Sequence, residues 1–181
     1  LHTSVASTQL VIPGNVESDR HITDNLYGGD LAYRLKQEIV LGIGGARLLD
    51  ALGFSIKKYH MNEGHAAFLT LELLDRSRRP LESTWDERAA WDTHRVIERC
   101  VFTTHTPVAA GHDRFPYDLA RKVMGEPVPM GLLKELAGAD ELNMTMLALN
   151  LSSYVNGVAK KHGQISQNLF PGFEIHAITN G

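Results

Sequence analysis

The chain has 181 residues, of which 43% are hydrophobic, so it is long enough to bury one sizeable core, and its length predicts one domain. Its 18 basic and 21 acidic residues nearly cancel to a net charge of −3 and lie scattered along the sequence, which argues against a nucleic-acid partner. No apolar stretch approaches the roughly 20 residues that cross a bilayer, and the N-terminus lacks the pattern of a secretory signal. We therefore expect a soluble, cytoplasmic protein with no membrane partner.

The first predicted element is a long helix over residues 30–52. Apolar side chains recur there in steps of three and four, which define one helix face, at Leu31, Leu35, Ile39, Ile43, Ala46 and Leu49. Gly42, Gly44 and Gly45 lie inside this pattern, and each would cost about 1 kcal/mol relative to alanine at an exposed position. We therefore predict that another backbone packs closely against this part of the helix.

The middle of the chain predicts two strands with helices around them. In chain order the pattern gives a strand over residues 55–61, a helix over 65–76, a helix over 86–99, a strand over 100–104 and a loop rich in Gly and Pro over 105–116. The single cysteine, Cys100, begins the second strand, where a buried and unreactive thiol is expected. Trp85 and Trp91 lie near the start of the second helix, where packing is favoured over a sugar-stacking platform.

The last third of the chain predicts three helices and one strand. The elements are helices over residues 117–124, 131–137 and 143–162 and a strand over 175–179. Three cations near the end of the third helix complement its dipole, and Gly163 is expected to close it. Strands separated by helices imply the α/β class, a Rossmann-like parallel sheet with helices on both faces, in which ligands gather at the carboxyl ends of strands.

Two of the predicted strands end in clusters of polar side chains. Asn62, Glu63 and His65 follow the first strand, and His105 and Thr106 follow the second. Both clusters are expected to face one crevice, because the carboxyl ends of parallel strands lie at the same edge. Imidazole, amide, hydroxyl and carboxylate groups suit the hydroxyls of a sugar, each of which donates and accepts hydrogen bonds.

Structural roles stay open for part of this set. His60 lies within the first strand and is interpreted as a packed core histidine. Asn62 and Glu63 can cap the helix that follows, because a side-chain oxygen there accepts from free amides at the helix start. His65 and His105 project from strand ends and are the better candidates for ligand contact.

A metal site is the rival interpretation of the same clusters. The side chains of ligand type are His60, Glu63, His65, His105, His112 and Asp113. His60 and His65 are separated by a strand-to-helix turn, which does not match the two-histidine helical pattern of zinc proteases. No metal is therefore expected.

Five longer runs of sequence carry a family resemblance. They are LYGGDLAYRLKQEIVLGIGGARLL (residues 26–49), HMNEGHAAF (60–68), FTTHTPVAAGHDRF (102–115), LNLSSYVNGVAKKHG (149–163) and ITNG (178–181). In this order they resemble the α-glucan phosphorylase family, in particular its shorter bacterial and archaeal branch. The resemblance implies that residues 1–181 are a fragment of the N-terminal, glucan-binding catalytic domain of a two-domain glycosyltransferase fold of the B type.

The resemblance also implies an activity for the full-length parent. Family members cleave α-1,4-glucans with inorganic phosphate and release α-glucose 1-phosphate with retained configuration. The implied cofactor is pyridoxal 5′-phosphate, held by a lysine of a C-terminal domain that is expected to be absent here, so the chain alone is expected to be inactive. The implied partners are the glucan and phosphate, and a homo-oligomeric parent is compatible with the resemblance.

Site residues carry over from the family position by position. His105 matches the catalytic histidine beside the glucosyl unit, which contacts the sugar 6-hydroxyl. Glu63 and His65 match an acidic residue and a histidine that line the pocket next to that sugar, and Asn62 and Thr106 are carried over as further substrate contacts. Longer family members have Asp-Thr-His-Pro where this chain has Glu63-Gly64-His65-Ala66.

Two other functions stay open at this point. A nucleotide-sugar glycosyltransferase, such as a glycogen or starch synthase, has a comparable strand, histidine and helix arrangement, although the VNGVAKKHG and LKQEIVLGIGG runs favour a phosphorylase. The other open interpretation is a non-catalytic carbohydrate-binding fragment.

Overall fold

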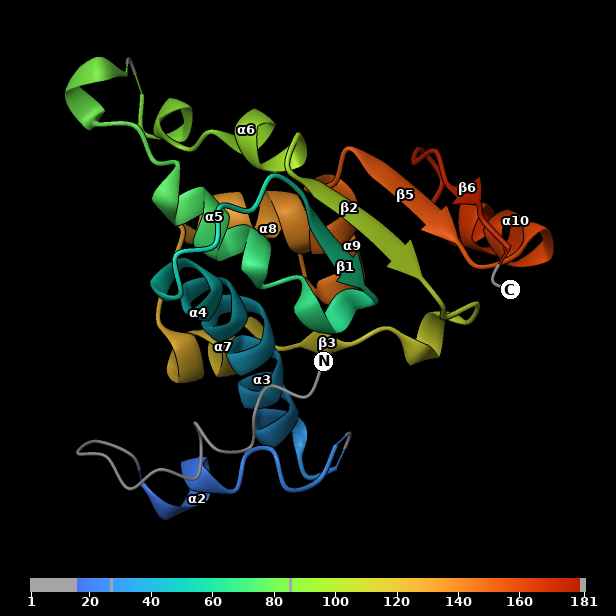
Figure 1. Cartoon of the computed structure of the whole chain (residues 1–181), viewed down its shortest axis with the longest axis horizontal. Coiled ribbons are helices and arrows are strands. Elements are labelled where there is room, and N and C mark those ends of the chain that lie inside the picture. The colour runs from blue at the N-terminus through green and yellow to red at the C-terminus, as the bar shows by residue number, and fades with distance from the viewer. Residues whose placement is uncertain (1–15, 27, 85, 180–181) are drawn as a thin grey trace.

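The computed structural model describes residues 16–26, 28–84 and 86–179, so the expected packing of Trp85 lies outside the described residues. Its centre is a four-stranded parallel sheet with the order β1-β2-β5-β6 (Figure 1), formed by Tyr59–Asn62, Cys100–Thr104, Tyr154–Gly157 and His176–Ala177. A short antiparallel pair joins β3 (Arg114–Phe115) to β4 (Leu142–Asn143). The parallel sheet with flanking helices confirms the predicted α/β class.

Helices lie before, between and after the strands along the chain. They are α2 (Glu17–Arg20), α3 (Leu31–Ile39), α4 (Gly45–Ala51), α5 (Leu69–Arg76), α6 (Thr93–Ile97), α7 (Tyr117–Met124), α8 (Met130–Ala137), α9 (Met144–Asn150) and α10 (Lys160–Leu169). In Figure 1, α5, α8 and α9 gather beside β1, and α10 lies beside β5 and β6. No helix in the described part of the chain is long and apolar enough to cross a membrane.

The two faces of the sheet differ in burial. The paired residues Met61, Phe102 and Val155 form one row and are 0%, 0% and 5% exposed, so this face packs against the helices. Because side chains alternate along a strand, their neighbours point to the opposite face. There His60 is exposed and Tyr154 is 38% exposed.

The predicted helix over residues 30–52 is present as one continuous helical segment. It runs through α3, a π-helical turn at Val40–Gly44 and α4. The Asp30 carboxylate caps its start by accepting a hydrogen bond from the Tyr33 amide at 2.8 Å. A β-carbon on Gly42 would lie 2.7 Å from the Leu69 amide nitrogen, so the predicted close packing of another backbone is confirmed at that glycine. At Gly45 the prediction is wrong, because nothing lies within 4 Å of a β-carbon there.

This contrast gives a test with a built-in control. Gly42→Ala is expected to destabilise the intact protein by about 1–3 kcal/mol, because the added methyl group overlaps the α5 backbone, which cannot yield as a flexible side chain can. Gly45→Ala is expected to be neutral or to stabilise by up to about 1 kcal/mol, because alanine favours the helix. Apparent melting temperatures of the two variants measure the difference. Equal melting temperatures would contradict the close approach at Gly42.

The predicted helix over residues 143–162 is wrong. Helix α9 ends at Asn150, Tyr154–Gly157 is the strand β5 between β2 and β6, and α10 begins at Lys160. The helical spacing of apolar residues continues past the end of α9 as far as Val155, but strand pairing decides the conformation there. Gly163 therefore lies inside α10, where a β-carbon would be 3.3 Å from Ala177 Cβ, instead of closing a helix.

Three smaller elements differ from the sequence predictions. The first strand begins at Tyr59, and the helix after it opens with a 3-10 turn at Gly64–Ala66 before α5. The predicted helix over residues 86–99 is broken into a 3-10 turn at Arg88–Ala90 and α6, because Asp92 caps a new helix start by accepting from the Arg95 amide at 3.0 Å. The Cys100 thiol is buried as predicted, and burial raises its pKa to about 12.

Candidate functional site

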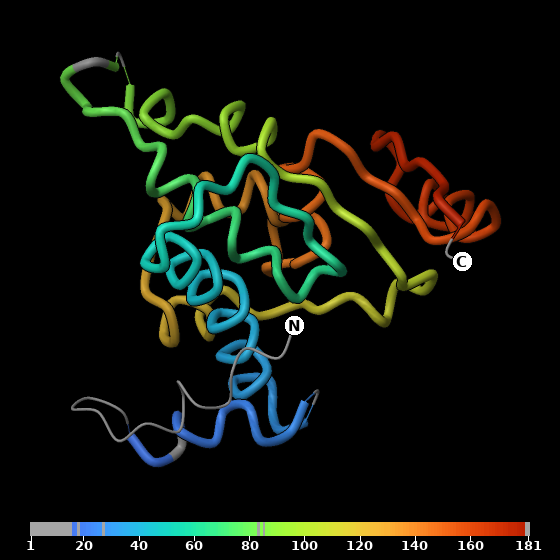
Figure 2. The backbone as a smooth tube through the Cα atoms, viewed as in Figure 1, coloured from blue at the N-terminus to red at the C-terminus, as the bar shows by residue number. Residues whose placement is uncertain are grey.

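The ends of β1 and β2 lie side by side, as their pairing requires. Asn62 is aligned with Thr103, and the next amide, that of Glu63, donates to the Thr103 carbonyl at 2.9 Å. The two polar clusters therefore leave the sheet at the same edge. After β2 the chain turns back past the end of β1 towards α3 (Figure 2).

The carboxylate of Glu63 joins these two strand ends directly. Its Oε2 accepts a hydrogen bond from the His105 amide at 2.7 Å and another from the Thr106 hydroxyl at 2.7 Å. Glu63 is 9% exposed and has φ 69° and ψ 171°, a region that is almost restricted to glycine and costs about 1–3 kcal/mol. The alternative of Glu63 as a helix cap is wrong, because its side chain makes no capping bond.

The remaining residues predicted at these strand ends are more accessible. Asn62 and His105 are exposed, while Thr106 is half-buried with its hydroxyl donated to Glu63. This edge of the sheet therefore exposes the amide of Asn62 and the imidazole of His105 to solvent. The bonds between Glu63, Thr106 and the His105 amide hold the backbone beneath them.

His60 is not a packed core histidine. It lies on the more exposed face of β1, an edge strand, with its Nε2 2.7 Å from the Thr103 hydroxyl oxygen. Thr103 in turn donates to Asn156 Oδ1 at 2.9 Å, so the hydroxyl accepts from His60. The core prediction failed because burial in an edge strand depends on what covers each face, which residue type alone does not determine.

His65 is held by a cluster of charged side chains. Its Nδ1 lies 3.0 Å from Asp113 Oδ2, and its side chain is 24% exposed. Arg34 binds both oxygens of Asp113, with Nε to Oδ1 at 2.6 Å and Nη2 to Oδ2 at 2.7 Å. The Nη2 atom also lies 3.4 Å from His65 Nδ1. Asp113 is the partner of that nitrogen, because its distance is shorter and two N–H donors cannot bond each other.

Glu38 lies beneath this cluster and is 3% exposed. Its Oε1 lies 3.6 Å from Arg34 Nε and 3.8 Å from His65 Nδ1, beyond hydrogen-bond distance. Burial therefore raises the pKa of Glu38 to about 7. The hydrogen bond to Asp113 and then the nearby Glu38 carboxyl group raise the pKa of His65 to about 9, so its imidazole is protonated at neutral pH.

Asp113 carries the negative charge of the cluster. Burial alone would raise the pKa of its carboxyl, but the hydrogen bonds from His65 and Arg34 hold the pKa well below its usual range. Glu38, His65 and Asp113 have ligand atoms within 4.8 Å of one another, a grouping that suits a metal ion. Since the Arg34 guanidinium already binds both Asp113 oxygens, we interpret the group as an ion-pair network.

His112 has a packing role. It is 8% exposed, its Nδ1 lies 2.8 Å from the Thr145 hydroxyl, and its ring meets Phe170 edge-on at 5.2 Å between centroids. Burial lowers its pKa, so it is neutral at neutral pH. This makes it a structural histidine at the base of the strand ends.

Comparison with known proteins connects this geometry to a family. The chain is 37% identical over 201 aligned residues to glycogen phosphorylase of Mycobacterium tuberculosis, covering 94% of this chain and 22% of that protein. It is 38% identical over 167 residues to maltodextrin phosphorylase of Thermococcus litoralis, covering 88% and 19%, and 32% identical over 185 residues to glycogen phosphorylase of Aquifex aeolicus, covering 92% and 26%. The chain matches a segment of the α-glucan phosphorylases. No protein-family model matches it.

The alignments cover nearly the whole chain but a small part of each relative. The chain spans 22% of the length of the mycobacterial phosphorylase and 19% of the archaeal one. The resemblance seen in the sequence is thereby confirmed for a phosphorylase segment.

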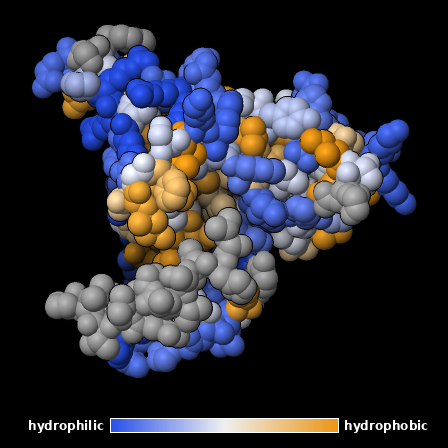
Figure 3. Space-filling model, viewed as in Figure 1, coloured by the Kyte–Doolittle hydropathy of each residue, from blue (hydrophilic) through white to orange (hydrophobic). Residues whose placement is uncertain are grey.

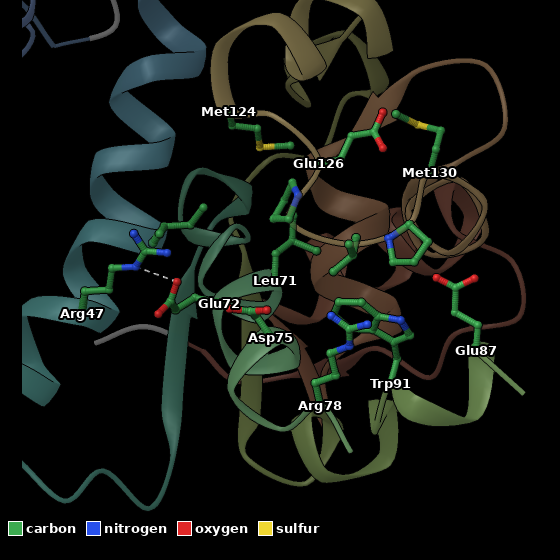
Figure 4. Close-up of a pocket in the computed structure, with 14 residues that line it drawn as sticks. Arg47, Leu71, Glu72, Asp75, Arg78, Glu87, Trp91, Met124, Glu126 and Met130 are labelled. Atoms are coloured by element: carbon green, nitrogen blue, oxygen red, sulfur yellow. Dashed lines mark hydrogen bonds and ion pairs between the residues drawn. The ribbon is translucent and has the colours of Figure 1, made fainter. Parts of the chain in front are cut away.

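Two surface features of this phosphorylase segment lie outside the strand-end clusters. Figure 3 shows an apolar area over α4, where Leu48 and Leu52 are 49% and 63% exposed. A pocket of about 640 Å³ opens beside α5, and none of the predicted site residues lines it. Figure 4 shows Arg47 bonded to Glu72 at one side of this pocket and Arg78 beside Trp91. We therefore place the candidate site at the strand ends and not in the pocket.

Sequence reasoning missed Arg34 and Glu38, and it considered Asp113 only as a metal ligand. A signal was present, because Arg34 and Glu38 are four residues apart and share a helix face next to the apolar stripe. What the sequence does not reveal is that the segment after β2 turns back to bring Asp113 onto α3.

Proposed function

We propose that this chain forms part of the glucosyl-binding site of an α-glucan phosphorylase, which transfers a glucosyl unit from an α-1,4-glucan to inorganic phosphate. The observation that carries the proposal is the Glu63 carboxylate, which ties the two strand-end clusters together through the His105 amide and the Thr106 hydroxyl. The names of the relatives, glycogen phosphorylase and maltodextrin phosphorylase, support the reaction and the substrate class.

The side chains at this edge suit a neutral sugar. Asn62 can donate and accept hydrogen bonds. His65 is protonated at neutral pH, so the ring nitrogen that is not bound to Asp113 carries an N–H donor for a hydroxyl oxygen. We assign His105 the catalytic position beside the glucosyl unit, with its backbone fixed by Glu63. Asn62, Glu63, His65 and Thr106 are the substrate-binding residues of the proposal. A fixed polar frame of this kind stabilises charge that develops in the transition state, because its dipoles need not reorganise.

The proposed reaction uses pyridoxal 5′-phosphate, a cofactor whose phosphate supplies a proton relay to the attacking phosphate. The strand-end residues Asn62, Glu63, His65, His105 and Thr106 offer no lysine amine to anchor it. They do not fit a pyridoxal phosphate site by themselves. We propose that the anchor lysine lies outside this chain, in a C-terminal domain.

The wider context of the proposal follows from the family. Residues 1–181 are assigned to the N-terminal, glucan-binding domain of the parent, whose partners are the glucan and inorganic phosphate. We propose a cytoplasmic location, without nucleic-acid or membrane partners, and leave a homo-oligomeric parent open.

The deciding experiment is an assay of the intact protein that contains this chain. Incubation with maltodextrin and inorganic phosphate is expected to release glucose 1-phosphate, whereas a nucleotide sugar is expected not to serve as glucosyl donor. Residues 1–181 alone are the control and are expected to release no glucose 1-phosphate. Chain extension from a nucleotide sugar without phosphorolysis would instead support the synthase alternative.

A further inference from the structure

The ion-pair network around His65 includes Arg34 and Asp113, which are not among the residues assigned to contact the sugar. We propose that Asp113, held by Arg34, is a positioning residue that fixes the orientation of the His65 ring for contact with the glucosyl unit. This inference rests on the proposed function, because it assumes that His65 contacts the sugar.

The geometry of the carboxylate is fixed first. Two parallel N–H donors of Arg34 bind its two oxygens at 2.6 and 2.7 Å, which sets both the position and the plane of the Asp113 carboxylate. Arg34 lies on α3, and Asp113 lies in the segment just before β3. The pair therefore ties a helix to the chain that follows the second strand end.

The orientation of His65 follows from that carboxylate. An ionised carboxylate accepts only, so the Nδ1 atom at 3.0 Å must carry the hydrogen that it donates to Oδ2. With Nδ1 turned towards Asp113, contact with a sugar hydroxyl falls to the opposite ring nitrogen, Nε2. A carboxylate on one ring nitrogen is a common device for fixing the tautomer and direction of the other.

The electrostatics agree with this geometry. Among the described residues, Arg34 and Glu38 on α3 and Asp113 before β3 are titratable groups that face His65. Strand β1, which also contacts the His65 turn, brings Tyr59 and His60, whereas α9 and the Val40–Gly44 turn bring no titratable side chain. With two carboxyl groups nearby, the pKa of His65 is raised to about 9, which keeps the ring a double donor at neutral pH.

A double-mutant cycle in the intact protein tests the proposal. Asp113→Asn keeps the side-chain shape but removes the charge, and we expect it to lower kcat/KM for maltodextrin phosphorolysis by about tenfold, mainly through KM. In a His65→Ala background the same change is expected to alter kcat/KM less than twofold, because the residue acts through the imidazole. An equal loss in both backgrounds would overturn the positioning role.

The pH dependence gives a readout that a merely structural role would not change. Without Asp113 the pKa of His65 is expected to fall towards its ordinary value of 6.5. The KM of Asp113→Asn should then rise more steeply between about pH 6 and 8 than the KM of the parent, in which His65 stays protonated while Glu38 titrates. Identical pH profiles for the parent and the variant would count against the proposal.

Glu135→Gln provides a matched control. Glu135 is also held by two N–H donors of one arginine, Arg88, at 3.2 and 3.1 Å, but its side chain is 57% exposed and no histidine takes part. The Glu135→Gln variant is expected to have the same kcat/KM and the same pH profile as the parent. Should Asp113→Asn fail to fold, Arg34→Lys replaces it in the cycle, because lysine keeps the positive charge but cannot bind both carboxylate oxygens through two parallel N–H donors. The loss of kcat/KM caused by Arg34→Lys must then also disappear in the His65→Ala background.

The outcomes separate the two proposals. If the intact protein performs phosphorolysis and His65→Ala weakens it, but Asp113→Asn acts independently of His65, the positioning role fails while the proposed function stands. If His65→Ala leaves phosphorolysis unchanged, the contact of His65 with the sugar is wrong and the positioning role fails with it. If the intact protein releases no glucose 1-phosphate at all, the function itself is wrong.

Discussion

His105→Ala is expected to lower kcat/KM for glucan phosphorolysis by the intact protein by about 10²–10³-fold, the effect of removing one well-placed polar group from a transition-state site. The proposed role places this imidazole beside the glucosyl unit, and the Glu63 carboxylate fixes its backbone through the amide at 2.7 Å. Because the His105 side chain is exposed, its removal should leave the fold intact. Steady-state release of glucose 1-phosphate measures the loss.

The control for this variant is His94→Ala. His94 lies on α6 and its side chain is 82% exposed; among the ion pairs of the described residues it contacts only Glu98, the C-cap of that helix, at 3.7 Å. Its replacement is expected to leave kcat/KM within about twofold, as for most surface changes. Full activity of His105→Ala under the same conditions would reject the catalytic assignment.

Glu63→Ala is expected to destabilise the protein by about 3 kcal/mol, because it removes two hydrogen bonds to a charged acceptor, each worth about 1.5–3 kcal/mol. It also leaves the His105 amide and the Thr106 hydroxyl to find other partners. The segment after β2 should then loosen, and catalysis should fall with it. The shift of the apparent melting temperature measures the loss of stability.

Glu63→Gly separates the hydrogen bonds from the backbone strain. Glycine loses the same two bonds but adopts φ 69° and ψ 171° without steric cost. It is therefore expected to be about 1–2 kcal/mol less destabilising than alanine at this position. Glu135→Ala, at an exposed ion pair, should stay within about 0.5 kcal/mol of the parent. If alanine proves more stable than glycine at position 63, the strained backbone is wrong.

Parts of this fold follow directly from local sequence. The strand over residues 100–104 and the helix over 117–124 were predicted with the bounds that the structure shows. The strand is an uninterrupted run of apolar and β-branched residues, which favours the extended conformation. The strand is buried once it pairs with its neighbours on both sides. In the helix Pro116 stands just before the start and Gly125, at φ 74°, ends it.

The error over residues 143–162 has a physical reason. Leu147 and Leu151 keep a four-residue spacing that suits a helix, and Val155 continues it by chance. Val155 is buried in the structure because β5 lies between β2 and β6, a position set by pairing with residues far away in sequence. Single-sequence periodicity contains no information on such pairing.

The candidate site also has a part that the sequence predicts and a part that it does not. The sequence predicts which residues leave the ends of β1 and β2, because strand ends and polar clusters are local features. It does not predict that Glu63 bonds across to His105 and Thr106, or that Arg34 reaches Asp113. These contacts depend on the path of the segment after β2, which local preferences leave undetermined.

The bridging carboxylate has a mechanical consequence. The Glu63 side chain, in the turn after β1, accepts hydrogen bonds from the turn after β2. A displacement of either turn is therefore expected to move the other with it. A force on one of the two turns is thus resisted by both strands at once. Insertions that lengthen the chain between positions 103 and 107 would uncouple them, so natural variation in length should fall further along, past Pro107.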